Sequence, residues 1–333
     1  MRGVFSMRSA GILFFAFFFV VPLLGVNRFY LYVATLVPIY VILAIGLNIL
    51  VGYAGQLAFA NAAMFGIGAY GAGLLIKHFA APYWVAAPAG AIAAMVVGTL
   101  LALPALRLSG IYLALATLAF AQCTLWTMTH WISVTYGASG FTIKAVDFTA
   151  LGMNSDYGMY YLSWICCCVL LLLARNLIRS RIGRAFVALR DHEIAAQSLG
   201  VNLLKYKALA FALSGFYAGV AGVLYAGVLA FVGPESFGLQ QMVLQLAAIV
   251  IGGTASIAGS VLGGFLIVFI QEIIREFKFS IEIAFGALLC LFVLLKPTGL
   301  IDLIRLVRPS WHERLHGSDL ADATASPTER GAQ

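Results

Sequence analysis

Charged residues that could do chemistry are concentrated in one polar stretch, residues 179–207, which holds eight of the chain's 33. It carries two acidic residues, Asp191 and Glu193, among a larger set of basic ones: Arg179, Arg181, Arg184, Arg190, Lys205 and Lys207. This stretch is too polar to lie in lipid, unlike nearly all of the chain before and after it.

The centre of this stretch predicts a short helix from Asp191 to Leu199. Asp191 is a favourable N-cap, and Glu193 lies in the first turn, where the helix dipole stabilises an anion by about 0.3–1 kcal/mol. A small apolar face follows: Ile194, Ala195, Ala196 and Leu199. Gly200 stands where a left-handed C-cap belongs. Because a two-turn helix is marginal in water, we expect another surface to dock on it.

The sequence argues against an enzyme and against ATP binding by this chain. No G-x-x-x-x-G-K-[ST] motif occurs, so the usual phosphate-binding loop is absent. No Ser/His/Asp set and no paired carboxylates are found, and the histidines are scattered: His78, His130, His192, His312 and His316. We therefore expect no cofactor and no metal.

The five cysteines all fall in apolar runs: Cys123, Cys166, Cys167, Cys168 and Cys290. Adjacent residues on a helix point in different directions, so the three consecutive cysteines do not form a metal site. We interpret all five as small hydrophobic residues.

The composition is that of a membrane protein. Hydrophobic residues make up 62%, charged residues only 10%, and the mean hydropathy is +0.99. A soluble domain has about 25% charged residues. The net charge of +7 does not indicate nucleic-acid binding, because the basic residues lie between apolar runs. The lipid bilayer is the expected environment.

The apolar runs predict an all-α polytopic protein with about eight to ten transmembrane helices. The ten candidate spans are 11–26, 29–51, 62–77, 84–106, 110–131, 160–178, 208–231, 239–251, 258–274 and 281–295. Those at 62–77, 239–251 and 258–274 are short for a full crossing, which suggests broken or re-entrant helices. The first run resembles a signal peptide in its basic flank, but without a clear cleavage site we interpret it as an uncleaved helix.

Basic residues predict the orientation. With ten crossings and both termini in the cytoplasm, the cytoplasmic segments hold fifteen of the twenty Lys and Arg residues. This places residues 179–207 in the cytoplasm, within a membrane domain spanning residues 1–307. Residues 308–333 are expected to form a disordered cytoplasmic tail. The outward loop 133–157 is either a docking surface or a connector.

Several uncharged polar residues lie within or at the ends of the spans. The candidates for lining a solute pathway are Asn48, Gln56, Asn61, Gln122, Gln241 and Gln245. Each is costly in hydrocarbon and should face another helix or a watery path. For any one of them, inter-helix bonding and pathway lining both remain open. None of these polar residues is charged, and this argues against a carrier coupled to protons or sodium ions.

Glycines cluster on the helices, and small residues at such spacings let helix backbones approach closely in lipid. Gly215 and Gly219 are one such pair, and Gly259 and Gly263 another. Two glycine-bearing turns also resemble each other, one at 48–55 and one at 249–256. They hint at duplicated halves with discontinuous helices.

Three stretches carry a resemblance to a known family. The run from Glu193 to Gly200, EIAAQSLG, resembles the E-x-A-A-x-x-x-G loop of ABC importer permeases. The runs GYAGQLAFANAAMFGIGAYGAGLL from Gly52 and IGGTASIAGSVLGG from Ile251 also resemble the LivM-like permeases of branched-chain amino acid importers. Together with GRAFVALRDHEIAAQSLGVNLLKYKALAFALSGFYAGVAGVLYA, they cover most of residues 40–298.

This resemblance implies an ABC importer permease fold and a location in the inner membrane. It implies a second homologous permease as heterodimer partner, two cytoplasmic subunits that bind and use ATP, and an external solute-binding protein. The ATPase-coupling residues would be Asp191, Glu193, Ala195, Ala196 and Gly200, with Glu193 facing the ATPase. The implied cargo is branched-chain amino acids, with urea, short amides or other small amino acids as alternatives. An autonomous secondary carrier or channel is the competing class.

Overall fold

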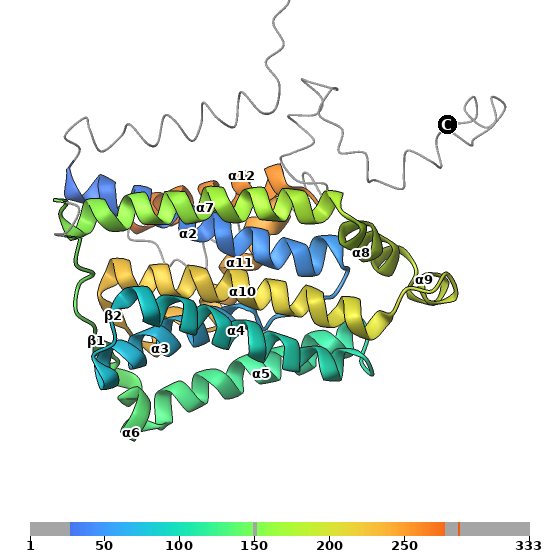
Figure 1. Ribbon diagram of the computed structural model, residues 1–333, viewed down its shortest axis with the longest axis horizontal. Coiled ribbons are helices and arrows are strands. Elements are labelled where there is room, and N and C mark those ends of the chain that lie inside the picture. The colour runs from blue at the N-terminus through green and yellow to red at the C-terminus, as the bar shows by residue number, and fades with distance from the viewer. Residues whose placement is uncertain (1–26, 149–151, 277–285, 287–333) are drawn as a thin grey trace, which may run out of the picture.

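The computed structural model describes residues 27–148, 152–276 and 286, and shows a bundle of helices running roughly side by side (Figure 1). The first predicted span, the tenth apart from residue 286, and the tail at 308–333 lie outside the described residues. The all-α membrane architecture expected from the sequence is confirmed, with one two-stranded ladder added at an end of the bundle.

The elements follow the predicted spans closely. The first half of the chain forms α2 (Arg28–Asn48), the π-helix η2 (Ile49–Tyr53), α3 (Asn61–Phe79), α4 (Tyr83–Ala105), α5 (Ile111–His130), α6 (Ile132–Thr135), the 3-10 helix η3 (Gly137–Ser139) and β1 (Phe141–Thr142). The second half forms α7 (Ser155–Arg179), α8 (Arg181–Asp191), α9 (Glu193–Ser198), α10 (Leu203–Leu229), β2 (Phe231–Val232), the 3-10 helix η5 (Pro234–Phe237), α11 (Leu239–Gly252) and α12 (Ile257–Glu276).

Among the described residues, five helices are long and apolar enough to cross a membrane: α2 continued by η2, α4, α5, α7 and α10. The spans predicted to be short correspond to α3, α11 and α12, which are not among the five. Helix α3 begins beside the middle of α10, where Asn61 accepts a hydrogen bond from Ser214 Oγ at 3.1 Å. The chain between η2 and α3 therefore runs without helix to the middle of the bundle.

The bundle has two distinct ends (Figure 1). At the α9 end, the end of α4, the loop after η2, the helices α8 and α9, and the start of α10 lie together. At the β end, β1 pairs antiparallel with β2, with Phe141 opposite Val232. The loop 133–148 is attached to this end, since Phe148 contacts the ring of Trp84 at a centroid distance of 5.7 Å.

Glycines bring α3, α4 and α10 into backbone contact. A β-carbon at Gly68 would collide with the backbone of Gly219, and one at Gly90 would lie 2.6 Å from the carbonyl oxygen of Gly68. At Gly215 it would lie 2.6 Å from the carbonyl oxygen of Ala94. These positions accept only glycine at this spacing, so the helical glycines have the packing role that the sequence predicts.

The two similar glycine-bearing turns lie against each other. Asn48, at the end of α2, donates to Ser256 O at 2.9 Å and to Ser260 Oγ at 2.6 Å. Its side-chain oxygen accepts from the backbone N–H of Ala255 at 2.9 Å. One amide thus satisfies the polar groups exposed where α11 ends and α12 begins.

Candidate coupling site at the alpha9 end

Helix α8 is firmly attached to the bundle. Ser180 caps it, accepting a hydrogen bond from the backbone N–H of Ile182 at 3.1 Å. The inward face is apolar and includes Phe186 and Leu189, both buried. The ring of Phe186 meets that of Tyr206 of α10 edge to face, with centroids 6.4 Å apart. Its outward face carries Arg181 and Arg184, which are exposed.

Helix α9 follows after a sharp break at His192. The prediction that Asp191 is the N-cap of this helix is wrong: Asp191 ends α8, and His192 in extended conformation precedes α9. The Asp191 carboxylate instead pairs with Arg190 at 3.1 Å. At the other end, Gly200 has φ +85°, the left-handed conformation that its position predicts.

The carboxylate of Glu193 points into the bundle. It forms an ion pair with Lys207 of α10, whose Nζ lies 2.9 Å from Oε1 and 3.0 Å from Oε2. Gln56 Nε2 donates to the same carboxylate at 3.2 Å. The expectation that Glu193 faces outward toward an ATPase therefore does not describe this structure. Its charge is neutralised within the chain.

Lys207 connects three elements through one buried ammonium group. Its side chain is only 3% exposed, and besides Glu193 it donates to the backbone carbonyl of Ala105 at 3.1 Å. Ala105 is the last residue of α4, where unpaired carbonyls and the helix dipole favour a cation. Lys207 thereby joins α9 and the C-terminal end of α4 to α10.

A second connection joins α8 to the loop after η2. Arg190 Nη1 donates to the backbone carbonyl of Gly52 at 3.2 Å. Gly55 has φ +67°, and a β-carbon there would lie 2.7 Å from Cγ and 2.9 Å from Cα of Arg190. Only glycine allows this approach. The helix pair α8–α9 is thus held by both α10 and the η2 loop.

The outward side of α9 displays aliphatic side chains beside the exposed polar residues Gln197 and Ser198. Ile194 is 86% exposed and Leu199 is 82% exposed, while Ala195 is also exposed. Of the predicted apolar face, Ala196 alone is buried against the bundle. Large aliphatic side chains displayed beside the charged groups of α8 fit a surface that another protein covers.

Five of the six pathway candidates are buried in contacts between elements. Asn48 bonds the α11–α12 turn and Gln56 bonds Glu193, as described above. Asn61 donates to Gln245 Oε1 at 2.9 Å, and Tyr40 donates to Gln241 Oε1 at 3.2 Å. These contacts give all five a role in joining helices.

Gln122 is the exception. It is exposed on α5 and makes no hydrogen bond to other described residues. It belongs to the least buried of the five membrane-length helices, whose outer surface also displays Leu115 and Trp126. An uncharged amide in this position would be unpaired in hydrocarbon, which favours a protein partner or a watery path beside it.

The expectation of no acidic residue within the spans has an exception, Glu272. It lies in the last turn of α12 and is partly buried. Within the part of the chain that the structure describes, no three His, Cys, Asp or Glu side chains are grouped to hold a metal ion.

Sequence reasoning missed Lys207 and Arg190 as members of this site. Both were visible only as basic residues of a polar stretch. The one available signal for Lys207 was its position four residues inside the following apolar helix, where an unpaired ammonium is costly. Nothing in the sequence indicated that its partner would be Glu193.

The chain is similar to the membrane subunits of several importers. The profile of the family "Branched-chain amino acid transport system / permease component" matches residues 29–295. The high-affinity branched-chain amino acid transport system permease protein LivM of Escherichia coli is 32% identical over 82% of this chain and 70% of its own length. LivH of Salmonella typhimurium is 27% identical over 80% of this chain and 92% of its own length. The ribose import permease protein RbsC of Haemophilus influenzae is 29% identical over 56% of this chain and 60% of its own length. No solved structure is significantly similar.

Proposed function

Because this chain belongs to the family of branched-chain amino acid transport permeases, we propose that it forms half of a translocation pathway driven by separate ATPase subunits. The observation that carries this proposal is the two-sided character of α9. Its inner side is bound to α10 through Glu193 and Lys207, and its outer side displays Ile194 and Leu199. A surface so anchored transmits the displacement of a docked partner to the helices.

The ATPases would dock at the α9 end, on the cytoplasmic side of the inner membrane. The basic residues support this orientation, since most of those described lie at that end, including Arg107, Arg179 and Lys205. Asp191, Ala195 and Gly200 would form or shape the contact, while Glu193 and Ala196 hold α9 to the bundle. ATP would be bound and hydrolysed by the partner subunits alone.

The second permease would cover α5. Both LivM and LivH are relatives of this chain, which supports a pair of homologous permeases. The exposed Gln122 on α5 supports the same placement, because its amide would then face the solute pathway or the partner instead of lipid. An external solute-binding protein would deliver cargo at the β end.

We propose branched-chain amino acids as the cargo, following the LivM relatives. The test is reconstitution of the chain with its homologous permease, ATPases and binding protein in proteoliposomes. ATP-dependent uptake of L-leucine should be saturable and should be competed by L-isoleucine and L-valine. Competition by urea, acetamide or small amino acids alone would assign the alternative cargo. Concentrative uptake by this chain alone would overturn the importer assignment in favour of a secondary carrier.

The docking surface is tested by Ile194→Ser with Leu199→Ser in the same assembly. The double variant should insert normally but lose co-purification with the ATPases. The matched control is Leu204→Ser, which changes a residue that is 48% exposed at the same end but outside α9. Equal loss in the control variant, or no loss in the double variant, would refute docking on α9.

A further inference from the structure

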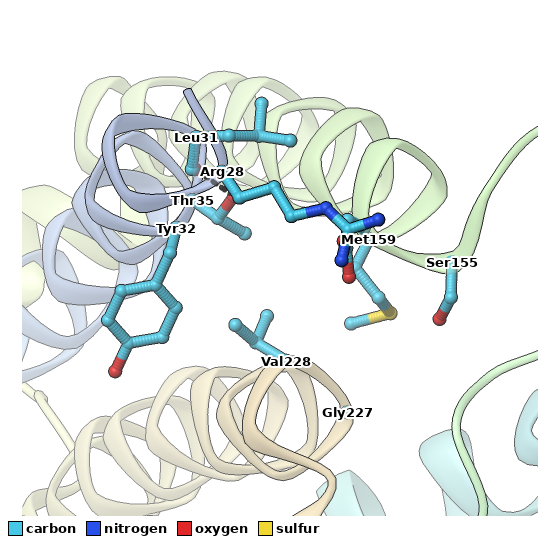
Figure 2. Close-up of a pocket in the computed structure, with 9 residues that line it drawn as sticks. Arg28, Leu31, Tyr32, Thr35, Ser155, Met159, Gly227 and Val228 are labelled. Atoms are coloured by element: carbon cyan, nitrogen blue, oxygen red, sulfur yellow. Dashed lines mark hydrogen bonds between the residues drawn. The ribbon is translucent and has the colours of Figure 1, made fainter. Parts of the chain in front are cut away.

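A cavity of about 160 Å³ opens at the β end between the first turns of α2 and α7 and the last turn of α10. None of its lining residues belongs to the candidate coupling site, which lies at the opposite end of the bundle. Figure 2 shows Arg28 extending from α2 across this space toward α7, with Met159 of α7 and Val228 of α10 pointing into it.

Two opposite charges border the cavity, one on each of two helices. Arg28 is the first residue of α2, and Asp156 lies in the first turn of α7. Both are exposed, and neither forms an ion pair with another residue in the ranges 27–148 and 152–276. The cavity therefore offers a guanidinium and a carboxylate that are both available to a ligand.

Helix energetics explains only one of these charges. An acid in the first turn is favourable, so Asp156 suits α7. Arg28 stands at the positive end of the α2 dipole, where a cation is unfavourable by about 0.3–1 kcal/mol. A bound anion would reverse this cost, and a guanidinium is well suited to bind a carboxylate through two parallel hydrogen bonds.

The remaining walls combine apolar side chains with the hydroxyl groups of Tyr32, Thr35 and Ser155. Leu31 and Met159 are buried, and Val228 is partly buried. A volume of about 150 Å³ is enough for a benzene-sized group, so an aliphatic side chain of four carbons has room beside Leu31, Met159 and Val228 while the charged end of the same molecule stays at the mouth.

We propose that this cavity binds one zwitterionic α-amino acid with an aliphatic side chain. Arg28 would bind the carboxylate, Asp156 the ammonium group, and Leu31, Met159 and Val228 the side chain. The inference rests on the proposed function, since it assigns a binding site within this subunit to the proposed cargo class. A charged ligand with two opposite ends would meet a matching group at each end.

The test uses the full chain purified in detergent without its partners. Binding of radiolabelled L-leucine is measured by equilibrium dialysis, with L-leucinol, which lacks the carboxylate, and 4-methylpentanoate, which lacks the ammonium group, as competitors. Arg28→Met and Asp156→Asn should each weaken L-leucine binding at least tenfold. The two analogues should then separate the charges, with binding of L-leucinol insensitive to Arg28→Met and binding of 4-methylpentanoate insensitive to Asp156→Asn.

Matched controls change charges of the same sign elsewhere. Lys144→Met and Glu235→Gln alter exposed residues at the β end outside the cavity and should bind L-leucine normally. Arg28→Lys should retain part of the affinity, which separates loss of charge from loss of folding. Wild-type affinity in both Arg28→Met and Asp156→Asn would overturn the site.

Two further outcomes would also overturn it. One is no saturable L-leucine binding by the folded wild-type chain. The other is that Arg28→Met releases co-purified phospholipid that L-leucine does not displace, which would assign Arg28 to a lipid headgroup. If the assembled importer still takes up L-leucine in either case, the proposed function stands and only this site falls.

Discussion

Glu193 and Lys207 form an ion pair of 2.9 Å in which the cation is buried and the anion is not: Lys207 is 3% exposed and Glu193 35%. Removing one partner is therefore not equivalent to removing the other. Without Glu193, the buried ammonium of Lys207 keeps the carbonyl of Ala105 as its one partner among the described residues. Without Lys207, the carboxylate keeps Gln56 and access to water.

The first prediction follows from this asymmetry. Glu193→Ala should destabilise the chain by about 2–3 kcal/mol, and Lys207→Met by about 1 kcal/mol or less, because an uncompensated buried charge is the larger cost. The double variant should be more stable than Glu193→Ala alone. Thermal unfolding of the purified protein in detergent measures all three. Equal destabilisation by the two single changes would show that Lys207 is not effectively buried.

Gly200 allows a test of backbone conformation alone, because an added β-carbon would contact no neighbouring atom. Its φ is +85°, and nothing lies within 4 Å of where a β-carbon would be. Gly200→Val should therefore cost only the left-handed conformation, about 1–2 kcal/mol, and leave the membrane domain inserted. Substrate-stimulated ATP hydrolysis by the assembled importer should fall, because α9 is displaced. Asparagine tolerates the left-handed conformation, so Gly200→Asn should retain most of the substrate-stimulated ATP hydrolysis. An equal loss of hydrolysis in both variants would point to another cause.

Gly55 combines the same kind of strain with a close contact. Gly55→Ala should separate α8 from the η2 loop, because its β-carbon would lie 2.7 Å from Cγ of Arg190. Gly110→Ala is the matched control, with φ +56° and open space around the β-carbon. We expect weaker ATPase co-purification and lower thermal stability for Gly55→Ala than for Gly110→Ala. Indistinguishable variants would mean that the contact with Arg190 is dispensable.

Substitutions of the polar residues in the spans should fall into two groups, those that lower stability and those that alter cargo uptake. Asn48→Leu removes three hydrogen bonds to the α11–α12 turn and should cost about 2 kcal/mol, at about 0.6 kcal/mol for each bond within a membrane. Gln122→Leu should leave thermal stability unchanged but alter the rate of cargo uptake. Thermal unfolding and uptake measured on the same preparations separate the two roles. A destabilised Gln122→Leu with normal uptake would contradict a pathway role for Gln122.

The orientation can be tested with single cysteines at Ser198 and Ser139 in a background lacking the five native cysteines. Both serines are exposed, Ser198 on α9 and Ser139 at the β end. An impermeant maleimide added to intact spheroplasts should label Ser139→Cys but not Ser198→Cys, and permeabilised cells should label both. Labelling of Ser198→Cys but not Ser139→Cys in intact spheroplasts would place the α9 end outside and the β end in the cytoplasm.

Much of the fold could be predicted from the sequence because hydrophobic length is a local property. The spans at 84–106 and 110–131 correspond to α4 and α5 within a few residues. Of the three runs predicted to be short, only 239–251 forms a short helix, α11 of 14 residues, whereas α3 and α12 have 19 and 20 residues. What could not be predicted is the start of α3 at the middle of the bundle, because it depends on hydrogen bonds to Ser214 and Gln245, which are far away in sequence.

The position of helix α9 was predicted from the sequence, but the geometry around it was not. The E-x-A-A-x-x-x-G spacing located α9, and the left-handed Gly200 followed from helix-ending rules. The direction of Glu193 did not, since capping rules concern local backbone groups and its actual partner is fourteen residues further along the chain. The break at His192, which removes Asp191 from the cap, likewise depends on how α8 packs.

The backbone contacts at Gly68, Gly90 and Gly219 have a mechanical consequence for the way force would enter the bundle. Helices that touch through backbone atoms have no flexible side chains between them to absorb displacement, so we expect α3, α4 and α10 to move together. Lys207 attaches α9 to two members of that body at once. A displacement of the six-residue helix α9 by a docked partner would thus reach three helices together.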